Sequence, residues 1–210
     1  MTAEPTQYRV LVDAKAWDER YAVREPVWSV TPNQFVAAEL ADLPPGRAVD
    51  VAAGEGRNAI WLARRGWRVT AVDFSRVALD KGRELAGDAE IEWVCEDATT
   101  WQADPTYDLA VIAYLQLPAP DRRAAVTNAF RALRPGGTFL LVAHDSTNLL
   151  RGSGGPQDPS VLMTAEDVLG DLAGEDFEVL RADCVNREVA RPDGGVATAL
   201  DALVRLVRRR

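Results

Sequence analysis

The sequence predicts an α/β fold: a doubly wound sheet, mostly parallel, with a C-terminal antiparallel hairpin and helices on both faces. Three observations predict it. Short apolar runs alternate along the chain with segments of helical periodicity. A glycine-rich turn follows the first apolar run directly, as it does where a parallel strand passes into a helix. Two long strand-like stretches lie near the end of the chain, joined by the turn residues Pro192-Asp193-Gly194-Gly195.

The first half of the chain supplies three strands and two helices. The apolar runs 48–52, 67–72 and 91–95 are typical of buried strands. A helix over 58–65 follows the glycine turn, and Ser75 is placed to cap a second helix. Because apolar strands alternate with helices, we expect a parallel sheet that is covered on both faces.

The second half continues the pattern and then changes it. Further strands are predicted over 108–114, 138–143, 177–189 and 198–207. A helix over about 120–133 is stopped by Arg134-Pro135-Gly136-Gly137. Another helix opens at Thr164, and Asp167 three residues later is typical of a capping box. Since a short turn joins the last two strands, they form the antiparallel hairpin.

The length of 210 residues fits a single domain over residues 1–210. Within it, residues 1–43 are expected to form a helical N-terminal arm that acts as a lid. The stretch 145–163 is rich in Gly, Ser and Pro. Long loops inside compact domains are usually functional or disordered, so this one is expected to be a mobile substrate loop.

Composition narrows the class of protein. Asp and Glu number 32 against 24 Lys and Arg, which gives a formal charge of −8 and argues against nucleic-acid and membrane-surface partners. The two cysteines, Cys95 and Cys184, form no metal-binding or disulfide pattern. The N-terminus has no signal-peptide pattern, and the longest apolar run, 109–115, is too short to span a bilayer. We therefore expect a cytoplasmic protein, a monomer or homodimer.

A nucleotide-type site is indicated by the segment Gly54-Glu55-Gly56-Arg57-Asn58-Ala59. It opens a helix after the first strand, and Asp73 ends the second strand nineteen residues after Gly54. Glycines allow close backbone approach to a ligand, and an acid at the second strand can bind two ribose hydroxyls. The alternative is a tight turn with an unrelated, solvated acid. We expect a ribose-bearing cofactor at this edge of the sheet.

Five motifs extend the signal over nearly the whole chain. In order they are Asp50-Val51-Ala52-Ala53-Gly54-Glu55-Gly56, Ala71-Val72-Asp73-Phe74-Ser75, Glu96-Asp97-Ala98, Tyr107-Asp108-Leu109-Ala110-Val111 and Leu133-Arg134-Pro135-Gly136-Gly137. In them the chain resembles the class I S-adenosylmethionine-dependent methyltransferases. It departs from the family pattern at Ala52-Ala53, where Gly-Cys or Gly-Thr is more usual. Trp17-Asp18-Glu19-Arg20-Tyr21 is similar to an N-terminal motif of small bacterial methyltransferases of the tellurite-resistance and ubiquinone-pathway types.

The resemblance implies a Rossmann-like sheet of seven strands in the order 3-2-1-4-5-7-6 and S-adenosylmethionine as co-substrate. It implies that Asp73 holds the ribose and Asp97 the adenine amino group, with Phe74 on the adenine face. The full set of cofactor-binding residues predicted is Tyr21, Ala53, Gly54, Gly56, Asn58, Asp73, Phe74, Asp97, Ala98 and Tyr114. Tyr21, with Arg20 as a second candidate, would close over the cofactor from the arm. Packing in the core or arm remains the alternative for Trp17, Trp28 and Trp101.

A nicotinamide cofactor is the competing interpretation of the glycine turn. A short-chain dehydrogenase would require a Tyr-x-x-x-Lys pair, and the lysines here are Lys15 and Lys81 alone. An antiparallel C-terminal hairpin is also a feature of methyltransferases rather than of dehydrogenases. Both observations favour S-adenosylmethionine.

The acceptor site is expected where the fourth and fifth strands end. His144, the single histidine of the chain, follows the fifth strand. Imidazole has an unperturbed pKa of ~6.5, which suits a general base that takes a hydroxyl proton near neutral pH. The alternative is a histidine that only orders the loop. Tyr114, Gln116 and Asp145 are the other candidate substrate residues, although Asp145 could simply turn the chain. No metal-ligand spacing accompanies them.

These features favour a small polar acceptor. A general base favours oxygen over sulfur, and a sugar-type hydroxyl, as in actinobacterial O-methyltransferases, is the leading hypothesis. A thiol, tellurite or a quinone-like molecule is the runner-up. A nonenzymatic regulator that binds S-adenosylmethionine is the alternative from another class.

Overall fold

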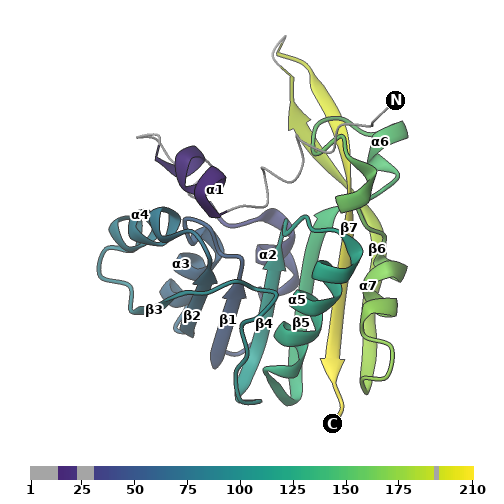
Figure 1. Cartoon of the computed structure of the whole chain (residues 1–210). Helices are drawn as coiled ribbons and strands as arrows, with labels where there is room; N and C mark the ends of the chain where they lie inside the picture. Colours follow the sequence, from purple (N-terminus) through teal and green to yellow (C-terminus); the bar gives the residue numbers. More distant parts are fainter. Residues whose placement is uncertain (1–13, 23–30, 192–193) are drawn as a thin grey trace, which may run out of the picture.

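A computed structural model describes residues 14–22, 31–191 and 194–210. These residues form one seven-stranded sheet in the order β3-β2-β1-β4-β5-β7-β6 with helices on both faces (Figure 1). The predicted fold class and strand order are confirmed. Among the described residues no helix is both long and apolar enough to cross a membrane.

Five strands of the sheet are parallel: β1 (Arg47–Val51), β2 (Arg68–Asp73), β3 (Ile91–Cys95), β4 (Tyr107–Ala113) and β5 (Leu133–His144). Two strands complete it, since β7 (Val196–Arg208) lies antiparallel between β5 and β6 (Phe177–Ala190). The chain runs outward from β1 to β3 on one side and from β4 on the other. The switch point therefore lies between the carboxyl ends of β1 and β4, where ligands bind in sheets of this kind.

Different helices cover the two faces of the sheet. On one face lie α2 (Gln34–Glu39) and α3 (Arg57–Arg64), and α4 (Arg76–Ala86) packs beside α3. On the other face lie α5 (Ala119–Arg131) and α7 (Ala165–Asp171), which contact each other. Ser75 caps α4 through a hydrogen bond from the Ala78 amide, as the sequence predicts.

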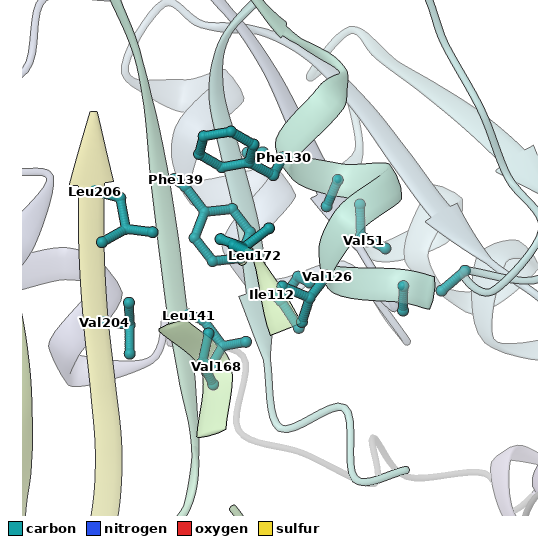
Figure 2. Packing of buried hydrophobic residues seen from close by; sticks show 14 of the residues in the cluster. Val51, Ile112, Val126, Phe130, Phe139, Leu141, Val168, Leu172, Val204 and Leu206 are labelled. Atoms are coloured by element: carbon teal, nitrogen blue, oxygen red, sulfur yellow. The ribbon is translucent and has the colours of Figure 1, made fainter. Parts of the chain in front are cut away.

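The two cores follow from alternation along each strand. In β5, Phe139 and Leu141 point to the α5 side, whereas Leu140 and Val142 point to the α3 side. Figure 2 shows the larger cluster, in which Phe139 contacts Phe130 of α5 edge to face at 6.1 Å between ring centroids. Both faces are buried, as the near-continuous apolar strands predict.

Two expectations from the sequence need correction in detail. Strand β5 begins at Leu133, because Leu133 pairs with Tyr107 before a register shift; the Arg134–Gly137 segment predicted as a turn is therefore part of the strand. A Cβ atom at Gly137 would lie 2.9 Å from the Arg134 carbonyl oxygen and 3.0 Å from that of Tyr107, so only glycine fits between them. The loop 145–163 contains a short helix, α6 (Asn148–Arg151), and a 3-10 turn, η2 (Pro159–Val161).

The N-terminal arm contains one further helix, α1 (Ala14–Tyr21), which lies against α4 at the carboxyl end of the sheet (Figure 1). Trp28, predicted as an arm aromatic, lies outside the described residues. Trp101 is buried in the larger core cluster, which agrees with the packing alternative for this residue.

Candidate active site

The glycine turn between β1 and α3 has the backbone conformation that its sequence predicts. Gly54 and Gly56 have φ values of 58° and 75°, and Ala52 also adopts a positive φ of 59°. A Cβ atom on Gly56 would lie 2.5 Å from the Trp93 ring, so no larger residue fits there without displacing that ring. The family preference for glycine at position 52 therefore has a conformational reason, which the alanine here overrides.

Asp73 fixes this turn to the end of β2. Its carboxylate accepts hydrogen bonds from the amides of Gly54 and Ser75, both at 2.8 Å, and the residue is only 5% exposed. Burial raises the pKa of Asp73, although the two backbone hydrogen bonds oppose the rise. The two oxygens retain lone pairs for a further donor such as a hydroxyl group.

Asp50 is a second buried acid at the turn, which the sequence reasoning did not propose as a site residue. Oδ2 accepts the Ala59 amide at 3.1 Å, whereas the buried Oδ1 has no hydrogen-bond partner among the described residues. Burial raises the pKa of Asp50 to about 7, against the lowering effects of the Ala59 amide and Arg57. The available signal was its place as the lone acidic residue of a strand whose other inner residues are apolar.

Asn58 connects the turn to the arm. Its Oδ1 accepts the Asn33 amide at 2.9 Å, and Asn33 in turn caps α2 through the amides of Phe35 and Val36. Both asparagines are buried. The side-chain oxygen of Asn58 therefore links α3 to the start of α2.

The end of β3 lies beside Asp73, since the Glu96 amide donates to the Asp73 carbonyl at 3.2 Å. Asp97 is exposed, and its Oδ1 accepts the amide and hydroxyl of Thr99, each at 2.7 Å. Phe74 is half-buried and Ala98 is buried. The residues predicted for the adenine side thus come from two adjacent strand ends.

Helix α1 covers this edge. Asp18 accepts hydrogen bonds from the Ser75 hydroxyl and, at 3.4 Å, from the Val77 amide at the start of α4. Tyr21 is buried and stacks on Trp17, with ring centroids 5.6 Å apart. The arm motif therefore docks beside Asp73, on the same edge as the predicted cofactor site.

A second polar cluster lies at the ends of β4 and β5 and on the C-terminal hairpin. It consists of Tyr114, His144, Arg187 and Asp201, which we call the hairpin cluster. Asp201 is fully buried at its centre: Oδ2 accepts the Tyr114 hydroxyl at 2.8 Å and Nε of Arg187 at 2.6 Å. Nδ1 of His144 lies 3.3 Å from Oδ1 of Asp201. The Tyr114 and His144 rings are 4.8 Å apart.

Charge in the hairpin cluster is balanced by these contacts. Burial acts to raise the pKa of Asp201, but His144, Arg187 and Tyr114 together hold it below its usual range. Burial and the neighbouring Asp201 raise the pKa of Tyr114, so its hydroxyl stays protonated and donates. Asp201 is therefore an ionised carboxylate inside the protein.

The two groups of residues adjoin across the switch point. Val51 pairs with Ile112 in the parallel register, so the turn that follows β1 lies next to Tyr114, which follows β4 with a positive φ of 62°. Arg57, the first residue of α3, interacts electrostatically with both Asp50 and Tyr114. The glycine turn and the hairpin cluster therefore lie on adjacent strand ends at the same edge of the sheet.

Gln116 and Asp145, predicted as substrate residues, have structural partners. The Gln116 amide accepts the His144 backbone N–H at 3.0 Å and donates to the Val161 carbonyl at 2.7 Å. Asp145 is buried, and its Oδ1 accepts the amide and hydroxyl of Thr147 at 2.8 and 2.6 Å. Both fix the end of β5, and Asp145 makes the turn that the sequence left open as its alternative role.

The glycine-turn residues fit S-adenosylmethionine, which the resemblance implies. The buried Oδ1 of Asp50, for which the described residues offer no hydrogen-bond partner, suits an ammonium donor. The Asp73 carboxylate suits hydroxyl donors. The positive-φ turn keeps Cβ atoms away from a ligand. Among the described residues no group of three His, Cys, Asp or Glu side chains could hold a metal ion.

Comparisons with known proteins agree with this geometry. Residues 48–137 match the family model of a methyltransferase domain. The demethylmenaquinone methyltransferase of Clavibacter sepedonicus is 30% identical over 149 residues, 67% of this chain and 59% of that protein. The ubiquinone biosynthesis O-methyltransferase of Alkalilimnicola ehrlichii is 30% identical over 60% of this chain and 54% of its own length. The chain thus spans under three-fifths of the length of these curated relatives.

Solved structures share the fold. The N-methyltransferase NodS of Bradyrhizobium japonicum, in complex with S-adenosylhomocysteine, superposes with a TM-score of 0.70 at 17% identity. The superposition covers 94% of this chain and 98% of that one. At this identity the likeness concerns the fold alone.

Proposed function

We propose, from its membership of the class I S-adenosylmethionine-dependent methyltransferases, that this chain methylates a hydroxyl group of a small polar acceptor, with His144 as the general base. S-adenosylmethionine supplies a methyl group on a sulfonium centre. The chain binds this co-substrate between the glycine turn and α1. The acceptor enters beside Tyr114 and His144.

One observation carries the proposal. His144 ends β5, the strand beside β4, with a side chain that is 16% exposed and next to Tyr114, which itself adjoins the glycine turn at the switch point. Its Nδ1 side faces Asp201, and no hydrogen bond of Nε2 is found among the described residues. A base needs one ring nitrogen held and the other accessible.

The work of the side chains follows from this arrangement. Asp73 and Asp50 hold hydroxyl and ammonium groups of the co-substrate, and Phe74 and Asp97 hold the adenine. Tyr114 lies between the two halves of the site and orders the acceptor against His144. Nε2 of His144 takes the hydroxyl proton as the oxygen–methyl bond forms, and later releases the proton to solvent. Alignment of acceptor and methyl group supplies the rest of the acceleration.

A carbon acid of a quinone-type ring is the second candidate acceptor. One relative is named a demethylmenaquinone methyltransferase and another a ubiquinone biosynthesis O-methyltransferase, and they align with 67% and 60% of this chain. Such a ring would also need a base to remove a proton, so His144 would act in the same way. Sugar-type hydroxyls fit the polar side chains at the strand ends and remain our leading hypothesis.

The test is an acceptor screen with methyl-labelled S-adenosylmethionine. It compares wild type with His144→Ala, using monosaccharides, nucleotide sugars, catechols, quinols and thiols. Transfer to a sugar hydroxyl that falls by about 10²–10⁴-fold in the variant, with unchanged S-adenosylhomocysteine affinity, supports the proposal. Transfer only to thiols, or retention of more than about a third of the rate, contradicts it, since that loss is the usual effect of removing a positioned base.

The same screen addresses the alternative from another class. A nonenzymatic regulator would bind S-adenosylmethionine and produce no S-adenosylhomocysteine with any acceptor. Formation of labelled product with one acceptor excludes it.

A further inference from the structure

We propose that Asp201 is a positioning residue that keeps the proton of neutral His144 on Nδ1, so that Nε2 is the nitrogen that accepts a proton. The tautomer itself is a property of the free protein. Its use in catalysis rests on the function proposed above.

The β5–β7 pairing places the two residues opposite each other. His144 and Asp201 are register partners in the antiparallel ladder, so their Cα positions are fixed by two long strands. Asp201 is 0% exposed, and its Oδ1 lies 3.3 Å from Nδ1 of His144. Nδ1 is itself buried and has no hydrogen-bond partner in the described structure. Asp201 is thus the acceptor placed to satisfy a proton on this nitrogen.

The other contacts of Asp201 leave Oδ1 for the histidine. Tyr114 and Nε of Arg187 both donate to Oδ2, whereas the one hydrogen bond that Oδ1 accepts from the described residues comes from Nη2 of Arg187, at a long 3.4 Å. The guanidinium and the phenol keep the carboxylate ionised, and an ionised carboxylate can only accept. If the proton were on Nε2, the Nδ1 lone pair would face Oδ1, which is repulsive. An unconstrained histidine side chain prefers the Nε2-protonated tautomer, so the protein has to reverse this preference.

The ring has little freedom to turn away. A Cβ atom built on Gly155 would lie 3.0 Å from Nδ1 and 3.1 Å from both Cγ and Cε1, so the loop backbone lies over the ring. Gly155 has a φ of 77°, which glycine adopts readily. The Tyr114 ring packs at 4.8 Å. In the described structure, a substrate proton therefore reaches the ring at the exposed part of the side chain.

The consequence for the reaction is a defined proton path. The acceptor hydroxyl gives its proton to Nε2, its oxygen takes the methyl group, and the carbon–sulfur bond breaks with its electrons on sulfur. The imidazolium then has a proton on each nitrogen, and the Nδ1 proton faces the Asp201 carboxylate. The Nε2 proton leaves to solvent, which restores the starting tautomer.

His144 is the single histidine of the chain, so its nitrogens can be observed without assignment. We would record long-range ¹H–¹⁵N correlations of ¹⁵N-histidine-labelled protein at a pH at which the ring carries one proton. In the wild type, Nδ1 should resonate as a protonated nitrogen and Nε2 as an unprotonated one. In Asp201→Asn the pattern should shift toward Nε2 protonation. The matched control is Asp183→Asn, an exposed acid on the neighbouring strand, which should leave the pattern unchanged.

The wild-type spectrum alone can overturn the proposal, even where Asp201→Asn fails to fold. A wild type with its proton on Nε2, or an unchanged tautomer in folded Asp201→Asn, contradicts it. Turnover separates the two proposals. If Asp201→Asn changes the tautomer and lowers kcat by about 10²-fold or more with little change in KM, both stand. If the tautomer changes while kcat is unaffected in His144→Ala, the positioning by Asp201 stands and the general base fails.

Discussion

At the scale of the residue, Ala52 is held in the left-handed region at a φ of 59°. Such a conformation costs an L-residue about 1–2 kcal/mol, whereas glycine adopts it freely but loses about 0.5–1 kcal/mol of chain entropy on folding. We expect Ala52→Gly to raise the free energy of unfolding by about 0.5–1 kcal/mol in urea denaturation. Ala53→Gly, where φ is not positive, is the control and should lower it. Equal losses in both variants would show that position 52 is unstrained.

Asp50 makes the free energy of unfolding decrease as pH rises, which is the opposite of the usual effect of an aspartate. Its pKa is about 7 in the folded protein, against 3.8 for an exposed aspartate. Between these values the folded state holds the extra proton, so stability falls as pH rises and the loss is complete above about pH 7. We expect Asp50→Asn, which cannot ionise, to be more stable than wild type by about 2–4 kcal/mol at pH 8.

Urea denaturation of both proteins without ligand measures this effect. The advantage of Asp50→Asn should shrink as pH falls from 7 toward 4 and vanish below the unfolded-state pKa of 3.8, where the wild-type carboxyl is protonated in both states. An advantage that is independent of pH, or that grows toward low pH, would contradict the burial of an uncompensated carboxyl. The amide in the variant still offers an oxygen to the Ala59 N–H, so this hydrogen bond is retained.

At the scale of the element, the 145–163 segment combines anchored ends with an exposed centre. Val161 and Met163 are fully buried. The Asn148 side chain makes two hydrogen bonds that hold the segment: Oδ1 accepts the Leu200 amide of β7 at 2.8 Å, and Nδ2 donates to the Gly154 carbonyl within the segment at 2.9 Å. Leu150, by contrast, is 90% exposed. The loop backbone over His144 therefore depends on Asn148.

We expect Asn148→Ala to release this loop. Two hydrogen bonds of a buried side chain are lost, each worth about 0.5–1.5 kcal/mol, so amides 152–158 should exchange with solvent roughly 5–150 times faster. Hydrogen exchange followed by mass spectrometry measures it, and Leu150→Ala serves as the control without effect. A substrate loop would be contradicted if amides 152–158 exchanged as slowly as those of β5. This slow exchange would have to occur in both wild type and variant, with and without S-adenosylhomocysteine.

The elements differ in how well the sequence predicts them. Strands such as β1 and β2 are buried on both faces, so their apolar runs mark them clearly. The short α6 is held by contacts of Asn148 with β7, which no local pattern reveals. The start of β5 was missed because Pro135-Gly136-Gly137 is typical of a turn, while pairing with Tyr107 extends the strand.

The residues of the candidate site also differ in how well the sequence predicts them. Asp73 and His144 could be found because strand ends collect at one edge of a parallel sheet. Arg187 and Asp201 could not, because their meeting with His144 depends on the register of the hairpin and of β5–β7. The signal that existed was a single carboxylate, Asp201, inside the otherwise apolar run of β7.

At the scale of the whole molecule, the topology joins two polar groups into one site. The parallel half of the sheet supplies the glycine turn and Asp73, and the antiparallel half supplies Asp201 to the back of His144. In the function proposed above, co-substrate binding and proton removal therefore belong to opposite sides of the switch point. Since these parts are held by one continuous sheet, a ligand at the glycine turn should stabilise the entire fold.

The last prediction measures that coupling. A ligand that binds only the folded state at 100 times its Kd adds about 2.7 kcal/mol to the unfolding free energy, which corresponds to a rise in Tm of about 5–10 °C for a chain of this size. We expect this rise with S-adenosylhomocysteine and none with NAD, by differential scanning calorimetry. Asp73→Ala should weaken binding by roughly 1.5–3 kcal/mol, because a charged acceptor for hydroxyls is lost. At the same ligand concentration the stabilisation should therefore fall to about 0.3–1.3 kcal/mol. Each Tm shift is taken against the same protein without ligand, since Asp73 also holds the Gly54 amide. A shift with NAD alone would overturn the assignment of the cofactor, and an undiminished shift in folded Asp73→Ala would exclude Asp73 as the ribose ligand.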